Sequence, residues 1–282
     1  MDRSPESCGG CRVSILDPTG NITALVQGNV PVDRQPSFAA QVMAQHPEVE
    51  QVGFVRILPV GSPIQAELRM AGGEFCGNAS LCAAALWMRE ADCVGSGQQV
   101  VRLRVSGAAN PVEVRMTQNG EGCFSGSVCM PRALRVVKKE LAFGSVVGAA
   151  PVVELEGISH VAIEEGSPLS ALRDDRAMAE AAVRAWCTEQ GASCMGLMFL
   201  EGEAPSLRLT PLVFVPKSGT LFWESSCASG SAAAGIALAE QMGGSASFSF
   251  IEPGGTIRVT SDGVRGETWL FGSVQLVAVQ EV

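Results

Sequence analysis

The chain has 282 residues, of which 46% are hydrophobic and 17% charged, a composition typical of a globular protein with one large or two ordinary domains. Its formal net charge of −9 and pI near 4.9 argue against nucleic-acid and anionic-membrane partners. Because no apolar run is long enough for a membrane span and residues 1–12 lack the apolar core of a secretory signal, we expect a cytoplasmic protein whose ten cysteines are reduced.

The N-terminal part predicts a hairpin followed by a short helix. Residues 12–16 and 22–26 alternate as strands around the turn Asp17-Pro18-Thr19-Gly20-Asn21. Asn21 lies at the edge of this turn, where its amide can face a cleft or simply complete the turn. A helix over residues 37–45 and strands over 50–55 and 65–70 follow.

Two short segments, each centred on one cysteine, organise the rest of the chain. Residues 73–80 place Cys76 after a strand-like run, and residues 224–231 place Cys227 after the run 220–223. Each segment continues into small and apolar residues (81–87 and 232–238) that are apolar all round. Such runs are typical of buried helices.

The order of elements around the two cysteines is the same. A strand, a cysteine, a buried helix and two strands joined by a glycine turn occur first in 66–116 and again in 220–260, with Gly107 and Gly254 in the turns. We interpret this as a duplication. Between the two copies the sequence predicts a crossing segment (131–137), strands (152–163, 195–200, 207–215) and an amphipathic helix (175–190, with Asp174 or Asp175 as N-cap and Gly191 after its end). A last strand, 269–279, could pair with the first half.

The strands are short and rarely linked by helices, which favours a mainly antiparallel α+β fold over a doubly wound parallel sheet. Both cysteines would then lie at helix N-termini. There the helix dipole lowers a thiol pKa and unpaired backbone N–H groups can bind a carboxylate. A thiolate on one side of a carbon and a thiol on the other could invert that carbon. The alternative is two unrelated buried cysteines.

Other chemistry is disfavoured. Cys8-Gly-Gly-Cys11 has no second pair, and His46 and His160 are distant from it in sequence, so we expect no metal site. A pyridoxal-phosphate enzyme would need one of Lys138, Lys139 or Lys217 as its Schiff-base lysine, and none lies in a glycine-rich phosphate loop. We therefore expect no cofactor.

At five islands the chain resembles the diaminopimelate epimerase-like superfamily, and within it the histidine racemases of staphylopine-type opine metallophore pathways. The islands are Asp17–Asn21, Glu50–Phe54, Glu74–Ala79, Leu221–Cys227 and Pro253–Gly255. They follow the family's order over nearly the whole chain.

The resemblance implies two pseudo-symmetric lobes, each a curved, mainly antiparallel sheet around a central buried helix. We expect an N-terminal lobe over residues 1–131, joined by the returning strand 269–282, and a C-terminal lobe over 132–268. The active site would lie between the lobes.

The resemblance also implies cofactor-independent racemisation or epimerisation, with Cys76 and Cys227 as the acid–base pair. Backbone N–H groups of Gly77, Asn78, Ala228 and Ser229 would bind the substrate carboxylate. By the same comparison, Asn21, Glu50 and Glu224 would contact the amino group or the side chain. Glu50 could equally be an ordinary strand-end carboxylate.

The sequence departs from the family at Ser225, where diaminopimelate epimerases carry an arginine that binds the far end of their substrate, and at Ala228, where glycine is usual. These departures argue against diaminopimelate as the substrate, and the resemblance to histidine racemases implies histidine. The alternatives are another amino acid such as diaminopimelate, a non-catalytic amino-acid-binding protein, and a thiol-redox protein using Cys8 and Cys11. The expected partner is a small-molecule amino acid, with no nucleic acid and no membrane, and a homodimer is left open.

Overall fold

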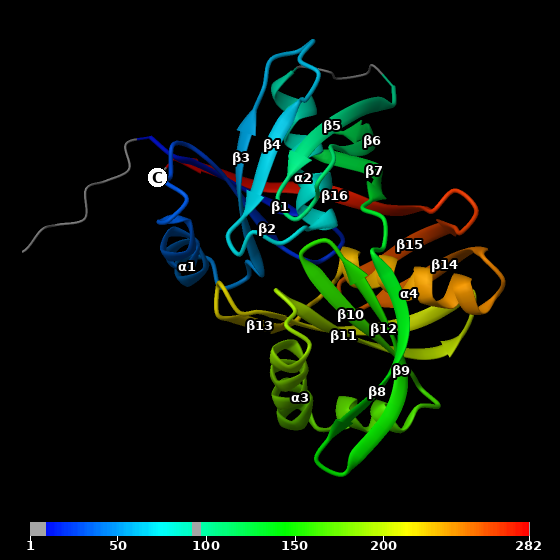
Figure 1. The fold of residues 1–282 in the computed structure, drawn as a ribbon. Helices are drawn as coiled ribbons and strands as arrows, with labels where there is room; N and C mark the ends of the chain where they lie inside the picture. The colour runs from blue at the N-terminus through cyan, green and yellow to red at the C-terminus, as the bar shows by residue number, and fades with distance from the viewer. Residues whose placement is uncertain (1–9, 92–96, 282) are drawn as a thin grey trace, which may run out of the picture.

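The computed structural model describes residues 10–91 and 97–281, and all sixteen strands within them belong to one hydrogen-bonded sheet (Figure 1). Eight strands close into a barrel. They are β1 (Arg12–Asp17), β2 (Thr23–Gln27), β3 (Gln51–Ile57), β4 (Ala66–Met70), β5 (Gln99–Val105), β6 (Val112–Gly120), β7 (Cys123–Met130) and β16 (Glu267–Glu281). Hydrogen bonds run in this order, and β16 pairs back with β1.

The other strands extend from the barrel as an open sheet. They are β8 (Arg135–Phe143), β9 (Val146–Leu155), β10 (Ile158–Glu164), β11 (Met195–Glu203), β12 (Ser206–Val215), β13 (Thr220–Trp223), β14 (Ser245–Glu252) and β15 (Gly255–Asp262). From β16 the order is β15, β14, β12, β11, β10, β9 and β8, and β13 pairs with β12. In Figure 1 the barrel lies above the open sheet, and the red strand β16 runs across the barrel toward β15 of the open sheet.

Strand β16 belongs to both parts because it is 15 residues long. Its residues 268–275 pair with β7 and residues 275–281 pair with β1, which closes the barrel. Residues 267–271 also pair with β15 on the opposite edge. The predicted pairing of the last strand with the first half is therefore confirmed.

Four neighbouring pairs of strands are parallel, and helices connect them as parallel strands require. Helix α1 (Gln35–Gln45) connects β2 to β3, and α2 (Gly77–Glu90) connects β4 to β5. A 3-10 helix, η1 (Pro168–Asp174), and α3 (Arg176–Glu189) connect β10 to β11, while β13 and α4 (Ala228–Gln241) lie between β12 and β14. The remaining pairs are antiparallel. The mainly antiparallel α+β prediction is confirmed.

Helices α2 and α4 are buried along most of their length. Every residue of α2 from Gly77 to Met88 is buried, and α2 contacts strands β2 to β7 and β16. Helix α4 contacts β9, β10, β11, β14, β15 and β16. Both helices are rich in alanine, which favours the helix and lets the strands approach closely. The all-round apolar pattern correctly predicted two buried helices.

Helix α3 is amphipathic, as predicted. Asp175 is its N-cap, and its carboxylate accepts a hydrogen bond from the N–H of Met178 at 3.0 Å. Gly191 takes a φ of +62° just after the helix, where glycine adopts a left-handed conformation without strain. Trp186 on the inner face is 1% exposed and packs into a core between α3 and β9 to β12.

Three elements were not predicted. Strand β7, strand β8 and η1 all occur where the sequence shows no clean alternation. The predicted crossing segment 131–137 is in part wrong, because residues 135–137 already belong to β8 and pair with β9.

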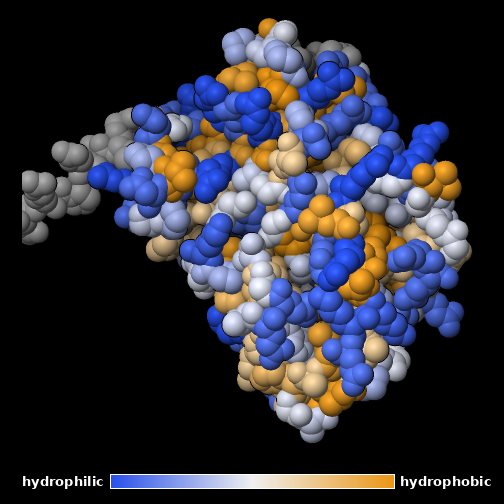
Figure 2. Space-filling view, viewed as in Figure 1, coloured by the Kyte–Doolittle hydropathy of each residue, from blue (hydrophilic) through white to orange (hydrophobic). Residues whose placement is uncertain are grey.

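Helices in the described ranges are all too short or too polar to cross a membrane. Figure 2 shows hydrophilic side chains spread over the visible face, with hydrophobic side chains in several separate groups among them.

Candidate active site

The two cysteines begin the two buried helices. Cys76 is the N-cap of α2, and its Sγ accepts a hydrogen bond from the N–H of Ala79 at 3.3 Å. Cys227 is the N-cap of α4, and its Sγ accepts one from the N–H of Gly230 at 3.4 Å. The predicted placement of both thiols is confirmed.

The two helix N-termini meet directly. A Cβ on Gly77 would lie 2.9 Å from the Cβ of Ala228, so only glycine permits this approach without a shift. The Asn78 side chain donates a hydrogen bond to the carbonyl oxygen of Ser226 at 3.2 Å. The first turn of α2 is therefore tied to the segment that carries Cys227.

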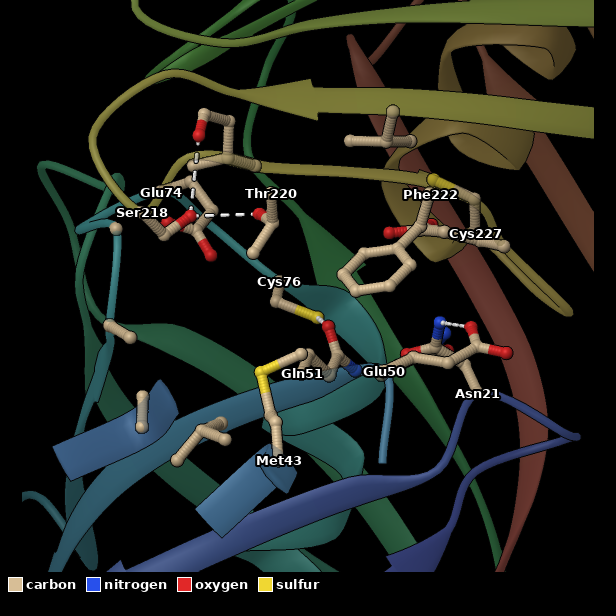
Figure 3. A pocket seen from close by; sticks show the side chains of 18 of the residues that line it. Asn21, Met43, Glu50, Gln51, Glu74, Cys76, Ser218, Thr220, Phe222 and Cys227 are labelled. Carbon is tan, nitrogen blue, oxygen red and sulfur yellow. Dashed lines mark hydrogen bonds between the residues drawn. The ribbon is translucent and has the colours of Figure 1, made fainter. Parts of the chain in front are cut away.

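Cys76 and Cys227 line one cavity of about 410 Å³, a size that accommodates a small ligand. Residues from the barrel, from α1 and from the open sheet surround it. They include Asn21, Ala39, Met43, Glu50, Gln51, Glu74, Asn78, Val213, Ser218, Thr220, Phe222, Glu224, Ala228 and Ser229. Figure 3 shows Cys76 near the centre, with Cys227 and Phe222 to one side.

The cavity is acidic. Three glutamates, Glu50, Glu74 and Glu224, are among its lining residues, and within residues 10–91 and 97–281 no lysine, arginine or histidine lines it. The buried Glu252 lies just outside the lining and accepts hydrogen bonds from the N–H of Cys227 at 2.6 Å and from the hydroxyl of Ser231. Such a cavity favours a cationic ligand over one with a second carboxylate.

Glu50 connects the barrel to the segment before Cys227. Its Oε2 accepts a hydrogen bond from the Asn21 side chain at 2.7 Å. Its Oε1 accepts one from the Ser225 hydroxyl at 2.5 Å, and the N–H of Ser225 lies 3.1 Å from Oε2. Burial raises the pKa of Glu50, although these hydrogen bonds oppose the rise. The carboxylate is thus occupied by donors of the protein itself.

The environment of Cys76 includes Gln51, which sequence reasoning missed. The Cys76 thiol donates to Gln51 Oε1 at 3.0 Å, and Gln51 Nε2 donates to Thr23 Oγ1 at 2.7 Å. Thr23 in turn donates to the carbonyl oxygen of Asn21 at 2.9 Å. In the sequence, the only indication of a role for Gln51 is that it is a polar residue next to Glu50 at the start of a strand.

Cys227 has a different environment. Its thiol donates to the carboxylate of Glu224, and its Sγ lies 3.7 Å from the hydroxyl oxygen of Ser229. The Ser229 hydroxyl also lies 2.9 Å from Nε2 of His160, which is fully buried on β10. Nδ1 of His160 has no hydrogen-bond partner in the described structure. An unpartnered acceptor costs less than an unpartnered N–H, so the Nε2–H tautomer is favoured and His160 donates to Ser229.

Burial lowers the pKa of His160 to about 3, so the ring is neutral at physiological pH. Sequence reasoning placed His160 outside any metal site but did not connect it with Cys227. His160 lies close to Cys227 only because β10 packs beside α4 in the folded protein, and this packing is not visible in the sequence.

The predicted direction of the thiol pKa shift is wrong. Burial raises the pKa of Cys76 to about 12; the hydrogen bond from the Ala79 N–H opposes this rise, and the nearby carboxylates of Glu224 and Glu74 add to it. Burial also raises the pKa of Cys227, with Glu224 and Glu252 adding to the effect. The helix N-termini do act on the thiols, but desolvation and nearby carboxylates outweigh them. Both cysteines are therefore favoured as protonated thiols in this environment.

Two carboxyl groups near the thiols, those of Glu224 and Glu252, are also desolvated by burial. Burial raises the pKa of Glu224 to about 8, with neighbouring Glu50 and Glu252 contributing, and burial raises that of Glu252 to about 8. A carboxyl group with such a pKa can exchange a proton near neutral pH.

Most of the predicted site residues come together in the cavity. Asn21, Glu50, Cys76, Asn78, Glu224, Cys227, Ala228 and Ser229 all line it. Gly77 does not line it and packs against Ala228 instead. No group of metal-ligating side chains is found in residues 10–91 and 97–281. Cys8 of the Cys8–Cys11 motif lies outside these ranges.

The overall fold is that of known racemases and epimerases. A hydroxyproline epimerase from Agrobacterium vitis superposes with a TM-score of 0.67 over 97% of this chain and 91% of that chain, at 14% sequence identity. With the site described above, the fold defines an isomerase of the amino-acid racemase and epimerase class.

The chain belongs to the histidine racemase family. Residues 13–282 match the family model described as the histidine racemase CntK N-terminal domain. A histidine racemase of Staphylococcus aureus is 30% identical over 250 residues, which are 88% of this chain and 87% of that protein. A histidine racemase of Fusobacterium nucleatum is 27% identical over 283 residues, 95% of this chain and 96% of that protein. The resemblance found in the sequence is confirmed.

Proposed function

We propose that the protein interconverts L- and D-histidine without a cofactor and that Cys76 and Cys227 are its acid–base pair. The observation that carries the proposal is the convergence of two cysteine-capped helix N-termini on one acidic cavity. Family membership supports histidine as the substrate, since the relatives named above are histidine racemases.

The cavity has a place for each charged part of histidine. The first turns of α2 and α4 supply backbone N–H groups and positive dipole ends for the carboxylate. The α-ammonium group is then next to Glu224 and Glu50, which line the same cavity. Diaminopimelate has a second carboxylate, and the part of the lining that the structure describes holds no basic residue to bind it.

Binding of the substrate also lowers the high pKa values of the two thiols. A cationic ammonium group among the carboxylates offsets their repulsion and lowers the pKa of both thiols and carboxyl groups. Glu224 accepts a hydrogen bond from the Cys227 thiol, so it is positioned to take that proton. The Cys227 thiolate then forms beside the substrate.

The reaction moves one proton on each face of the α-carbon. The Cys227 thiolate removes the α-proton, the electron pair remains on the α-carbon next to the bound carboxylate, and the Cys76 thiol donates its proton to the opposite face. One C–H bond breaks and one forms, and the charge moves from one sulfur to the other. The reverse direction uses the same groups in exchanged roles.

The proposal includes two pseudo-symmetric lobes, with residues 1–131 and 269–282 in one and 132–268 in the other. Support comes from the repeated order of parallel and antiparallel pairs around α2 and α4. A supply of D-histidine to an opine metallophore pathway, a cytoplasmic location and a homodimer remain predictions from the sequence.

Incubation of a panel of L-amino acids in D₂O tests the function. Histidine should show both exchange of its α-hydrogen and loss of optical rotation, and diaminopimelate and alanine should show much less of either. A protein that binds histidine but exchanges no α-hydrogen is a binder, which would refute the racemase proposal. Better turnover of diaminopimelate would refute the substrate.

A further inference from the structure

Glu74 has a free acceptor inside the cavity. It lies between β4 and α2 and lines the cavity two residues before Cys76. One carboxylate oxygen accepts a hydrogen bond from its own backbone N–H, and the buried Oε2 has no partner in the described structure. A buried acceptor without a partner is costly and points to a donor that arrives with the ligand.

We propose that Glu74 binds the side chain of the substrate and gives the cavity its preference for a side chain with an N–H donor. This inference rests on the proposed function. It differs from the expectation drawn from the sequence, in which Glu50 or Glu224 would hold the ring.

The other two glutamates are already occupied. Glu50 accepts hydrogen bonds from Asn21 and from both the hydroxyl and the N–H of Ser225. Glu224 accepts a hydrogen bond from the Cys227 thiol. A carboxylate offers about four lone-pair positions, so Glu50 has little capacity left. Glu74 is the carboxylate in the lining with a buried oxygen that lacks a protein donor.

Glu74 also lies at the correct end of the cavity. In Figure 3, Glu74, Ser218 and Thr220 are on one side of Cys76, and Glu50 and Asn21 are on the other. A substrate whose α-carbon is between the thiols and whose amino group is near Glu50 therefore extends its side chain toward Glu74. The hydroxyls of Ser218 and Thr220 are 2.8 Å apart and add polar groups at this end.

Much of the cavity wall is apolar and suits a flat ring. Helix α1 contributes five lining residues, Pro36, Ala39, Ala40, Met43 and Ala44. Strand β13 contributes Phe222, which lies on the other side of Cys76 from Glu74 in Figure 3. Aromatic and small aliphatic surfaces favour an unsaturated ring, while the single carboxylate fixes its orientation through one N–H. Imidazole has both properties.

The backbone makes room for the Glu74 carboxyl group. A Cβ on Gly72 would overlap its Oε2, and would also lie 2.6 Å from Val215. Glycine at position 72 therefore lets the carboxyl group lie against the chain. Burial raises the pKa of Glu74, and Arg69 and Lys217 oppose this rise. The two nearby cations therefore offset part of the cost of ionising this buried carboxyl group.

The test compares Glu74→Gln with wild type on L-histidine and its two N-methyl derivatives, each of which has one ring nitrogen blocked and can donate only from the other nitrogen when the ring is protonated. In wild type, methylation of the recognised nitrogen should raise KM by about tenfold to a hundredfold, the scale of one hydrogen bond to a charged group. In Glu74→Gln, KM for histidine should rise similarly with kcat little changed, and the two methyl derivatives should become alike. Gly72→Ala, which displaces the carboxyl group, should show the same loss of discrimination.

Glu67→Gln is the matched control. Glu67 is on the neighbouring strand β4 but forms exposed ion pairs with Arg56 and Arg104, so its removal should leave all three substrates unchanged. Glu50→Gln should alter turnover of all three substrates together. If Glu74→Gln changes KM by the same factor for all three substrates while wild type racemises histidine, the inference is wrong and the proposed function stands. If wild type does not racemise histidine, both are wrong.

Discussion

Replacement of Gly77 by alanine should impair catalysis through packing alone. The added Cβ would lie 2.9 Å from the Cβ of Ala228 and 3.2 Å from Sδ of Met130. Methionine can move, but the Ala228 Cβ is fixed to the first turn of α4, so α2 and α4 must separate by several tenths of an ångström. Alanine keeps the backbone N–H, so the change leaves the proposed carboxylate contact chemically intact.

The expected magnitude follows from the geometry. Overpacking of a buried contact typically costs about 1–3 kcal/mol, against at most about 1 kcal/mol gained from the higher helix propensity of alanine. A small displacement of acid–base groups can cost up to about a hundredfold in rate. We expect kcat/KM for histidine to fall by about tenfold to a hundredfold, with a modest fall in Tm.

A second substitution provides the decisive assay. Ala228→Gly removes the other Cβ, so the Gly77→Ala/Ala228→Gly double variant should recover most of the lost kcat/KM. Gly120→Ala, where a new Cβ meets nothing within 4 Å, is the control. Racemisation rates and thermal unfolding should be measured for all variants. A Gly77→Ala enzyme with full activity, or a double variant no better than the single, would refute the contact as the determinant of thiol alignment.

Further predictions concern the thiols and the buried carboxyl groups. Cys76→Ser or Cys227→Ser should lower racemisation by about a hundredfold or more because a hydroxyl is a poor base at neutral pH, and a fully active variant would disprove the two-thiol mechanism. Mild oxidant should inactivate the empty enzyme reversibly through a Cys76–Cys227 disulfide, with histidine protecting; peptide mapping that finds no such crosslink counts against facing thiols. Glu252, whose folded pKa is raised to about 8, binds its proton more tightly when folded. Its stabilising contribution is therefore full below about pH 4.5 and is lost as pH rises toward 8, so Tm should fall over this range in wild type and less in Glu252→Gln. Equal slopes in the two proteins would contradict this assignment.

Local signals in the sequence were sufficient to predict the framework of the site. The β1–β2 hairpin follows from alternation around a turn, and the helix after each cysteine follows from a run of small apolar residues. The Asp175 cap and Gly191 bound α3 as expected. These features depend on neighbours within a few residues, which a sequence displays directly.

The features that were missed depend on distant segments. Gln51 and His160 acquire their roles only when β3 and β10 are packed beside the two cysteines. The thiol pKa values were predicted to fall because the helix terminus is local, whereas the carboxylates that raise them, such as Glu252, converge from other strands. Strand β7 lacks alternation because buried and half-buried residues are mixed along it, between its partners β6 and β16.

Strand β16 has a consequence for the order of assembly during synthesis. It follows every other strand in the chain, yet it closes the barrel against β1, the first strand. A nascent chain can form the seven preceding barrel strands but must leave β1 and β7 as open edges until β16 emerges from the ribosome. Unpaired edges of this kind invite association with other chains. The second cysteine-capped helix, α4, is made before this closure. Barrel closure must therefore wait for the synthesis of β16, and it joins strands whose pairing spans nearly all of the described chain.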